Sequence, residues 1–76
     1  MEEIHKYLKN QPNDKLFFLL KESEKRAFRK DSIIKKIIDE YFESKQLFNI
    51  SLLILRNEIM KELIARMNEN INLIIK

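Results

Sequence analysis

The chain contains no glycine in its 76 residues. Glycine adopts positive φ without strain, and tight β-hairpin turns depend on it. Valine and threonine, two residues that favour strands, are missing as well, whereas isoleucine, leucine and lysine are abundant. These omissions leave few ways to build a sheet, so the sequence predicts a mainly α-helical protein.

A chain of this length forms at most one small hydrophobic core, and such chains usually need a disulfide, a metal ion or a second subunit. The sequence has no cysteine, which excludes disulfides and thiolate zinc ligands. We therefore expect a single domain over residues 1–76 that forms a homodimer. The acidic start Met-Glu-Glu and the short apolar runs predict neither a signal peptide nor a membrane span, so we expect the protein in the cytoplasm.

No pattern of residues predicts catalysis. His5 is the only histidine, and there is no glycine-rich loop to bind a phosphate group. Asp39, Glu40 and Glu43 lie among lysines on one side of a predicted helix, where surface charge explains them. We expect no enzyme activity, no cofactor and no metal site.

Apolar spacing predicts two helices in the first half of the chain. One spans residues 13–28, begins after Pro12, and has an apolar stripe of Leu16, Phe17, Leu19 and Leu20. The next spans residues 31–46, with Asp31 or Ser32 as its cap and an apolar face of Ile33, Ile34, Ile37, Ile38 and Tyr41. Residues 1–11 are ambiguous, because Ile4, Tyr7 and Leu8 fit a helical face while the segment also fits a short extended arm.

The last predicted helix, residues 51–74, has the alternating spacing of four and three residues that is typical of coiled coils. The residues at this spacing are Leu53, Asn57, Met60, Ile64, Met67, Ile71 and Ile74. Asn57 either fixes the register of a helix pair or is simply a partly exposed polar residue. We expect this helix to contribute much of a dimer interface.

The positive charge of the chain is concentrated in one segment. The net charge is +3, but residues 25–36 contain a single acidic residue, Asp31, among six basic ones: Lys25, Arg26, Arg29, Lys30, Lys35 and Lys36. Such a cluster is typical of a nucleic-acid-binding surface. A solvated helix end with flanking charges is the alternative.

Residues 12–42, "PNDKLFFLLKESEKRAFRKDSIIKKIIDEYF", resemble the two-helix unit of the ribbon-helix-helix transcription regulators. The similarity lies in the proline before the first helix, Leu16 and Leu20, Ser32 near the second helix start, and Ile34 and Ile38 before "EYF". The resemblance implies a dimer in which residues 4–10 pair as a two-stranded ribbon in the DNA major groove, with Ser32 at a phosphate and with an extra C-terminal helix.

We therefore predict a small dimeric DNA-binding protein, a transcriptional regulator, with a ribbon-helix-helix-like fold. Its predicted DNA-binding residues are Lys6, Lys9, Asn10, Arg26, Arg29, Lys30 and Ser32. Its predicted dimer-interface residues are Ile34, Ile38, Met60, Ile64, Met67 and Ile71.

The alternative is an all-α four-helix bundle with helices at residues 2–10, 13–28, 31–46 and 51–74. "KKIIDEYFESKQ" followed by "LLILRNEI" is similar to a stretch of the small helical immunity proteins of bacteriocin producers. This alternative implies a protein-binding module, such as an immunity protein, an antitoxin or a viral adaptor, in which the basic cluster binds an acidic protein partner.

Overall fold

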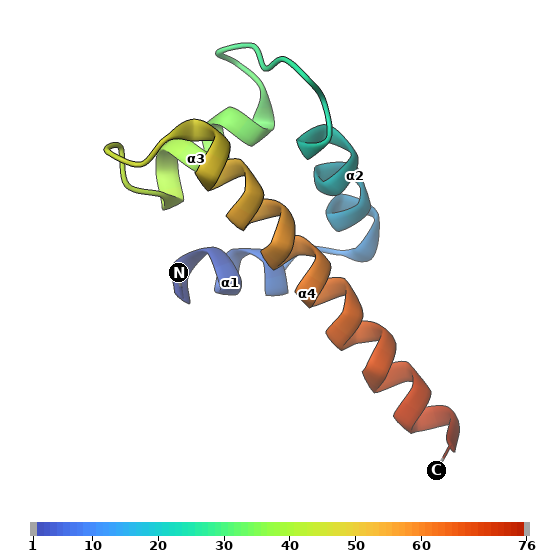
Figure 1. Ribbon diagram of the computed structural model, residues 1–76. Coiled ribbons are helices and arrows are strands. Elements are labelled where there is room, and N and C mark those ends of the chain that lie inside the picture. The colour runs from blue at the N-terminus through green and yellow to red at the C-terminus, as the bar shows by residue number, and fades with distance from the viewer. Residues whose placement is uncertain (1, 76) are drawn as a thin grey trace.

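The computed structural model describes the backbone of residues 2–75 and the side chains of residues 3–69. Its four helices are α1 (Glu2–Lys9), α2 (Asn13–Ser23), α3 (Ile33–Tyr41) and α4 (Phe48–Ile75). The three short helices gather around the first half of α4, which extends beyond them (Figure 1). No strand occurs in the described backbone. The predicted mainly helical class is confirmed, in its four-helix form.

The N-terminal segment is helical, so the prediction of a ribbon over residues 4–10 is wrong. Ile4 and Leu8 are fully buried, and Tyr7 on the same helical face packs on Tyr41 with ring centroids 5.3 Å apart. A strand would turn Tyr7 to the opposite side from Ile4 and Leu8, whereas a helix places all three on one face, with Tyr7 partly buried at its edge. Burial, followed by the nearby Tyr41 and Glu40, raises the pKa of the Tyr7 phenol above its ordinary value.

The hydrophobic core draws on all four helices. Its buried side chains are Ile4, Leu8, Leu16, Leu19, Ile34, Ile37, Ile38, Phe42, Leu55 and Ile59. Ile34 and Ile38, predicted at a dimer interface, lie in this core because α3 packs its isoleucine face against α2 and α4 of the same chain. Phe17, predicted in the apolar stripe of its helix, is instead 59% exposed.

The helices begin and end at residues that supply hydrogen-bond partners. α2 stops at Ser23, before the predicted residue 28, and the Arg56 guanidinium donates a 2.8 Å hydrogen bond to the Ser23 carbonyl. α3 starts after Ser32, whose hydroxyl accepts a 3.1 Å hydrogen bond from the Lys35 amide. This cap satisfies one of the free N–H groups of the first turn.

The second half of α4 holds the turn between α1 and α2. The Arg66 guanidinium donates hydrogen bonds to the carbonyls of Leu8, Lys9 and Gln11 at 3.3, 3.1 and 2.6 Å, and to the Asn13 side chain at 2.7 Å. Its Nε also pairs with Glu62 at 3.0 Å. Neither α4 nor any other described helix combines the length and apolar character that crossing a bilayer requires.

Candidate functional site

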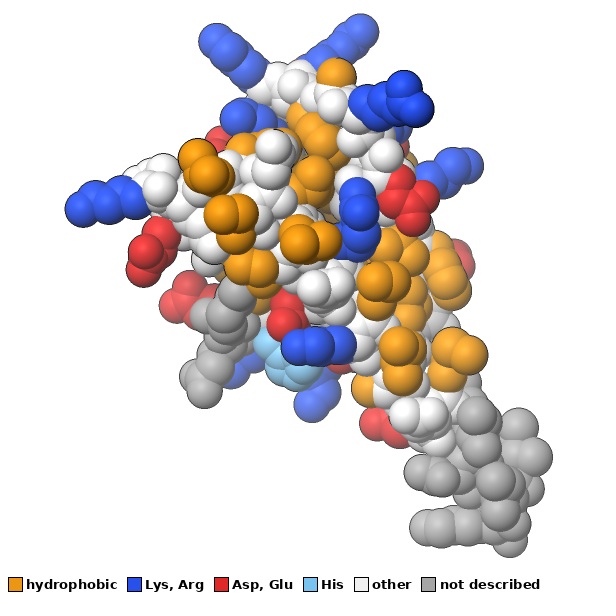
Figure 2. Space-filling model, viewed as in Figure 1, with side chains coloured by type: hydrophobic (Ala, Val, Ile, Leu, Met, Phe, Trp, Pro, Cys, Tyr) orange, Lys and Arg blue, Asp and Glu red, His pale blue; other side chains and the backbone are white. Residues whose placement is uncertain are grey.

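The segment between α2 and α3, residues 24–32, carries most of the clustered positive charge, and we call it the basic connection. It runs as an irregular loop at one end of the molecule (Figure 1). Figure 2 shows several basic side chains projecting into solvent from this same end. Lys25, Arg26, Arg29 and Lys30 are all exposed, and Lys35 and Lys36 follow in the first turn of α3.

Three contacts fix the basic connection on the rest of the chain. Arg56 of α4 binds the carbonyl of Ser23, immediately before the connection. In its middle, the Phe28 ring packs edge-on against Phe48 at the start of α4, with centroids 5.4 Å apart and an interplanar angle of 63°. At its end, Ser32 caps α3. The connection is therefore held in place although it lacks regular structure.

Most of the cations on this surface are available to a ligand. Lys25 pairs with Glu22 at 2.6 Å, and the Lys35 ammonium lies 4.9 Å from the Phe48 ring centroid. Arg26, Arg29 and Lys30 make no ion pair with any described residue. Three unpaired cations on one anchored loop attract an anionic surface.

The start of α3 adds to this positive potential. The first turn of a helix carries free N–H groups and the positive end of the helix dipole, both of which favour anions. Asp31, exposed beside the Ser32 cap, is the only carboxylate between residues 25 and 36 and opposes that effect. The cations rather than the helix start therefore dominate the electrostatics of the site.

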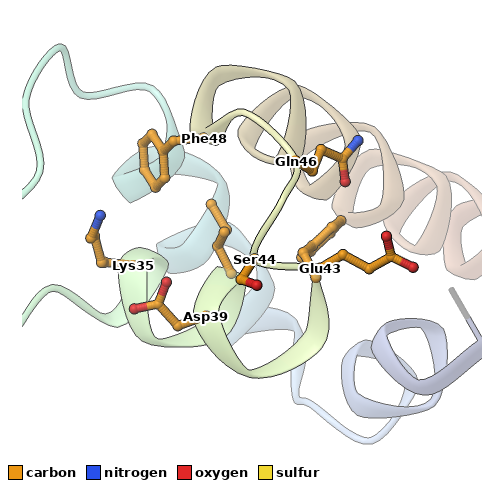
Figure 3. Close-up of a pocket in the computed structure, with 8 residues that line it drawn as sticks. Lys35, Asp39, Glu43, Ser44, Gln46 and Phe48 are labelled. Carbon is orange, nitrogen blue, oxygen red and sulfur yellow. The ribbon is translucent and has the colours of Figure 1, made fainter.

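A hollow of about 340 Å³ lies between α3 and the start of α4, and Lys35 of the positive cluster is among the residues that line it. Figure 3 shows Lys35, Asp39 and Phe48 on one side of it, Glu43 and Gln46 on the opposite side, and Ser44 between them. The two carboxylates repel anions, so the hollow marks the boundary of the positive surface rather than an extension of it.

The predicted DNA-binding residues fall into two separate groups. Arg26, Arg29, Lys30 and Ser32 lie together on the basic connection. Lys6, Lys9 and Asn10 lie on α1 and in the turn after it, well away from the connection in Figure 1. Their predicted role depended on the ribbon, and the helical structure of α1 removes its basis.

The predicted dimer residues of the last helix lie on the surface of the single chain. Met60, Ile64 and Met67 are 39%, 56% and 61% exposed. The side chain of Ile71, predicted with them, lies outside the described residues. Phe17 of α2 joins Met60, Ile64 and Met67 around a shallow apolar hollow. This exposed face leaves room for a partner.

The sequence interpretation missed the aromatic pair that positions the basic connection. Phe28 is the last residue of the predicted helix 13–28, at its polar end, and Phe48 precedes the predicted start of the last helix at residue 51, so neither had a place in an apolar stripe. The available signal was Phe28 itself, an isolated aromatic residue within a strongly charged segment. An aromatic ring gains by leaving water and packing on a second ring, here that of Phe48.

Comparisons of the chain with known protein families, with curated proteins and with solved structures found no match. The similarity to ribbon-helix-helix regulators therefore rests on residues 12–42 alone. In that segment α2 and α3 are present, but residues 4–10, where the resemblance places a strand, form α1 and the turn after it.

Proposed function

We propose that the protein binds nucleic acid, with duplex DNA as the ligand, through the basic connection. The observation that carries this proposal is a set of exposed cations that form no ion pair with any described side chain, Arg26, Arg29 and Lys30. They lie on a loop that Phe28 and Ser32 hold in place. A preorganised loop loses little conformational freedom on binding, which favours affinity.

The contact is made to phosphates. Arginine forms paired hydrogen bonds with phosphate oxygens, and lysine adds a mobile point charge. Contacts of this kind are independent of base sequence and release bound counterions, so the affinity falls steeply as salt rises. Because residues 4–10 are helical, reading of bases by a ribbon is not included in the proposal. A transcriptional regulator in the cytoplasm remains the expected role.

Paired double variants test this proposal. Arg29→Ala with Lys30→Ala removes two charges from the basic connection, and Lys6→Ala with Lys9→Ala removes two from α1. Binding to labelled duplexes of unrelated sequence is measured by fluorescence anisotropy over a series of salt concentrations. We expect the first pair to weaken binding to every duplex and to reduce the slope of log K against log salt by about two, since each lost phosphate contact removes about 0.9.

The α1 pair is the control: it removes the same charge, and we expect its slope of log K against log salt to equal that of the wild type. Equal effects from both pairs would show that only net charge matters, and a wild-type protein that binds no duplex at low salt contradicts the proposal.

An acidic protein is the other ligand that these cations suit, in a helical protein-binding module such as an immunity protein, antitoxin or viral adaptor. Tighter binding to polyglutamate than to DNA at equal salt would favour that alternative.

A further inference from the structure

α4 has a second apolar face that the rest of the chain leaves uncovered. We call it the outer seam; in order along the helix it consists of Ile50, Leu53, Asn57, Met60, Ile64 and Met67. Its five apolar members are between 39% and 61% exposed. The core-facing side of the same helix is occupied by Leu55 and Ile59, which are fully buried. Figure 2 shows apolar side chains in a band beside α4.

The area of the outer seam is close to what a specific interface needs. Taking roughly 150–200 Å² for a fully exposed large side chain, these residues and Phe17 leave on the order of 500 Å² of apolar surface in water. Two such surfaces together bury on the order of 1,000 Å² before flanking polar side chains are counted. Specific interfaces begin at about 1,200 Å².

The free end of α4 also requires support. Among the described side chains of α4, none after Glu62 is buried, yet the helix continues to Ile75 and extends past the other helices (Figure 1). Leu63 and Arg66 still contact the rest of the chain, whereas a helical segment as short as the one that follows them is marginally stable in water without tertiary packing. A second helix along the outer seam supplies that packing.

The residue types in the outer seam indicate which helix would pack against it and in which orientation. Ile50 and Ile64 occupy one set of alternate positions, with Asn57 between them, and Leu53, Met60 and Met67 occupy the other. Among parallel coiled coils, β-branched residues at the first set with leucine at the second favour two helices over three or four, and one asparagine at the first set fixes their register. Here the second set has one leucine and two methionines, so the orientation is argued from Asn57. In a parallel pair each asparagine meets its own counterpart. In an antiparallel pair it faces an apolar residue and loses a hydrogen bond.

We propose that the outer seam binds the outer seam of a second copy of this chain, parallel and in register, so that Asn57 meets the partner subunit's Asn57. Phe17 lies beside Met60, Ile64 and Met67 and widens the contact at the flank of the seam. Phe28 contacts Phe48 at the beginning of α4, so a parallel pair places both basic connections at the same end of the dimer. The residues that support the dimer differ from those that support DNA binding, so the dimer proposal holds whether or not the protein binds DNA.

Disulfide trapping tests the parallel register, because the chain has no cysteine of its own. Leu53→Cys and Met67→Cys are made as separate variants and oxidised. In a parallel pair both variants crosslink, since each cysteine lies opposite its counterpart within about 7 Å between Cα atoms. The two positions are about 21 Å apart along the helix, so an antiparallel pair crosslinks at one of them at most. Asp39→Cys, exposed on α3, measures random collisions.

Sedimentation equilibrium tests the second copy itself. We expect the wild type to have twice the chain mass and Ile64→Asp to have the mass of one chain. Because Ile64 is exposed in the single chain, the variant keeps the helical circular dichroism of the four-helix core and loses at most the part that comes from the free end of α4. The matched control Ala65→Asp adds the same charge beside the seam and stays dimeric. A monomeric wild type, a dimeric Ile64→Asp, or a crosslink at fewer than two seam positions each overturns the proposal.

Discussion

Arg66 shows how much of this small fold depends on one side chain. Its guanidinium reaches the backbone carbonyls of Leu8, Lys9 and Gln11 as well as Asn13, while Glu62, buried on the same helix, holds its Nε. The last carbonyls of a helix have no partner within it, and a cation at that end also interacts favourably with the helix dipole. One arginine of α4 therefore closes α1 and fixes the entry into α2.

Replacing Arg66 with methionine keeps most of the apolar stem and removes all of these hydrogen bonds. We expect the free energy of unfolding to fall by at least about 1.5–3 kcal/mol, the usual contribution of one hydrogen bond that involves a charged group. Lys25→Met is the control, because Lys25 pairs with Glu22 at an exposed site where such a pair contributes at most about 1 kcal/mol. Urea denaturation at a fixed protein concentration measures both. Equal losses in the two variants would contradict a structural role for Arg66.

At the scale of elements, the helices differ in how far local sequence determines them. α3 has a polar cap, Ser32, followed by an isoleucine face. Of its members, Ile34, Ile37 and Ile38 are buried and Ile33 is partly buried. Its start was predictable because the cap and the first turn are neighbours in sequence. Its end at Tyr41 came earlier than the predicted residue 46, because Phe42 turns into the core in an extended conformation.

The end of α2 and the form of α1 depended on distant contacts. The polar residues after Ser23 carry no apolar periodicity, and the side chain that binds the Ser23 carbonyl, Arg56, is 33 residues away. In α1, Ile4 and Leu8 share a face in a helix and in a strand alike, so only the burial of Tyr7 against Tyr41 distinguishes the two. For α4 the spacing placed Met60, Ile64 and Met67 on one face, which is exposed in the single chain. It did not indicate that Leu55 and Ile59 form the core-facing side.

Ser32→Ala tests the capping of α3. We expect a loss of about 1 kcal/mol, typical for an N-cap serine, which corresponds to a fall of about 4–8 °C in Tm for a domain of this size. Ser44→Ala changes an exposed serine in the loop before α4 and should leave Tm unchanged. The measurement is thermal unfolding followed by circular dichroism at one protein concentration, since dimerisation makes Tm depend on concentration. Equal Tm values for the two variants would show that the cap contributes no stability.

At the scale of the whole molecule, the two proposed surfaces lie on different parts of one framework. The basic connection is fixed at the beginning of α4 by Phe28 and Phe48, and the outer seam runs along the same helix toward its free end. A parallel dimer therefore presents two basic connections side by side to one ligand. Linking two contacts in this way raises the overall affinity well above that of either alone.

The most direct test of this account is the stoichiometry and affinity of DNA binding by the wild type and by Ile64→Asp, measured by analytical ultracentrifugation with a short labelled duplex. We predict two chains per duplex for the wild type. We also predict at least tenfold weaker binding by Ile64→Asp, although every cation of the basic connection is intact, because a monomer engages only one connection. One chain per duplex with equal affinity for both proteins would contradict the account.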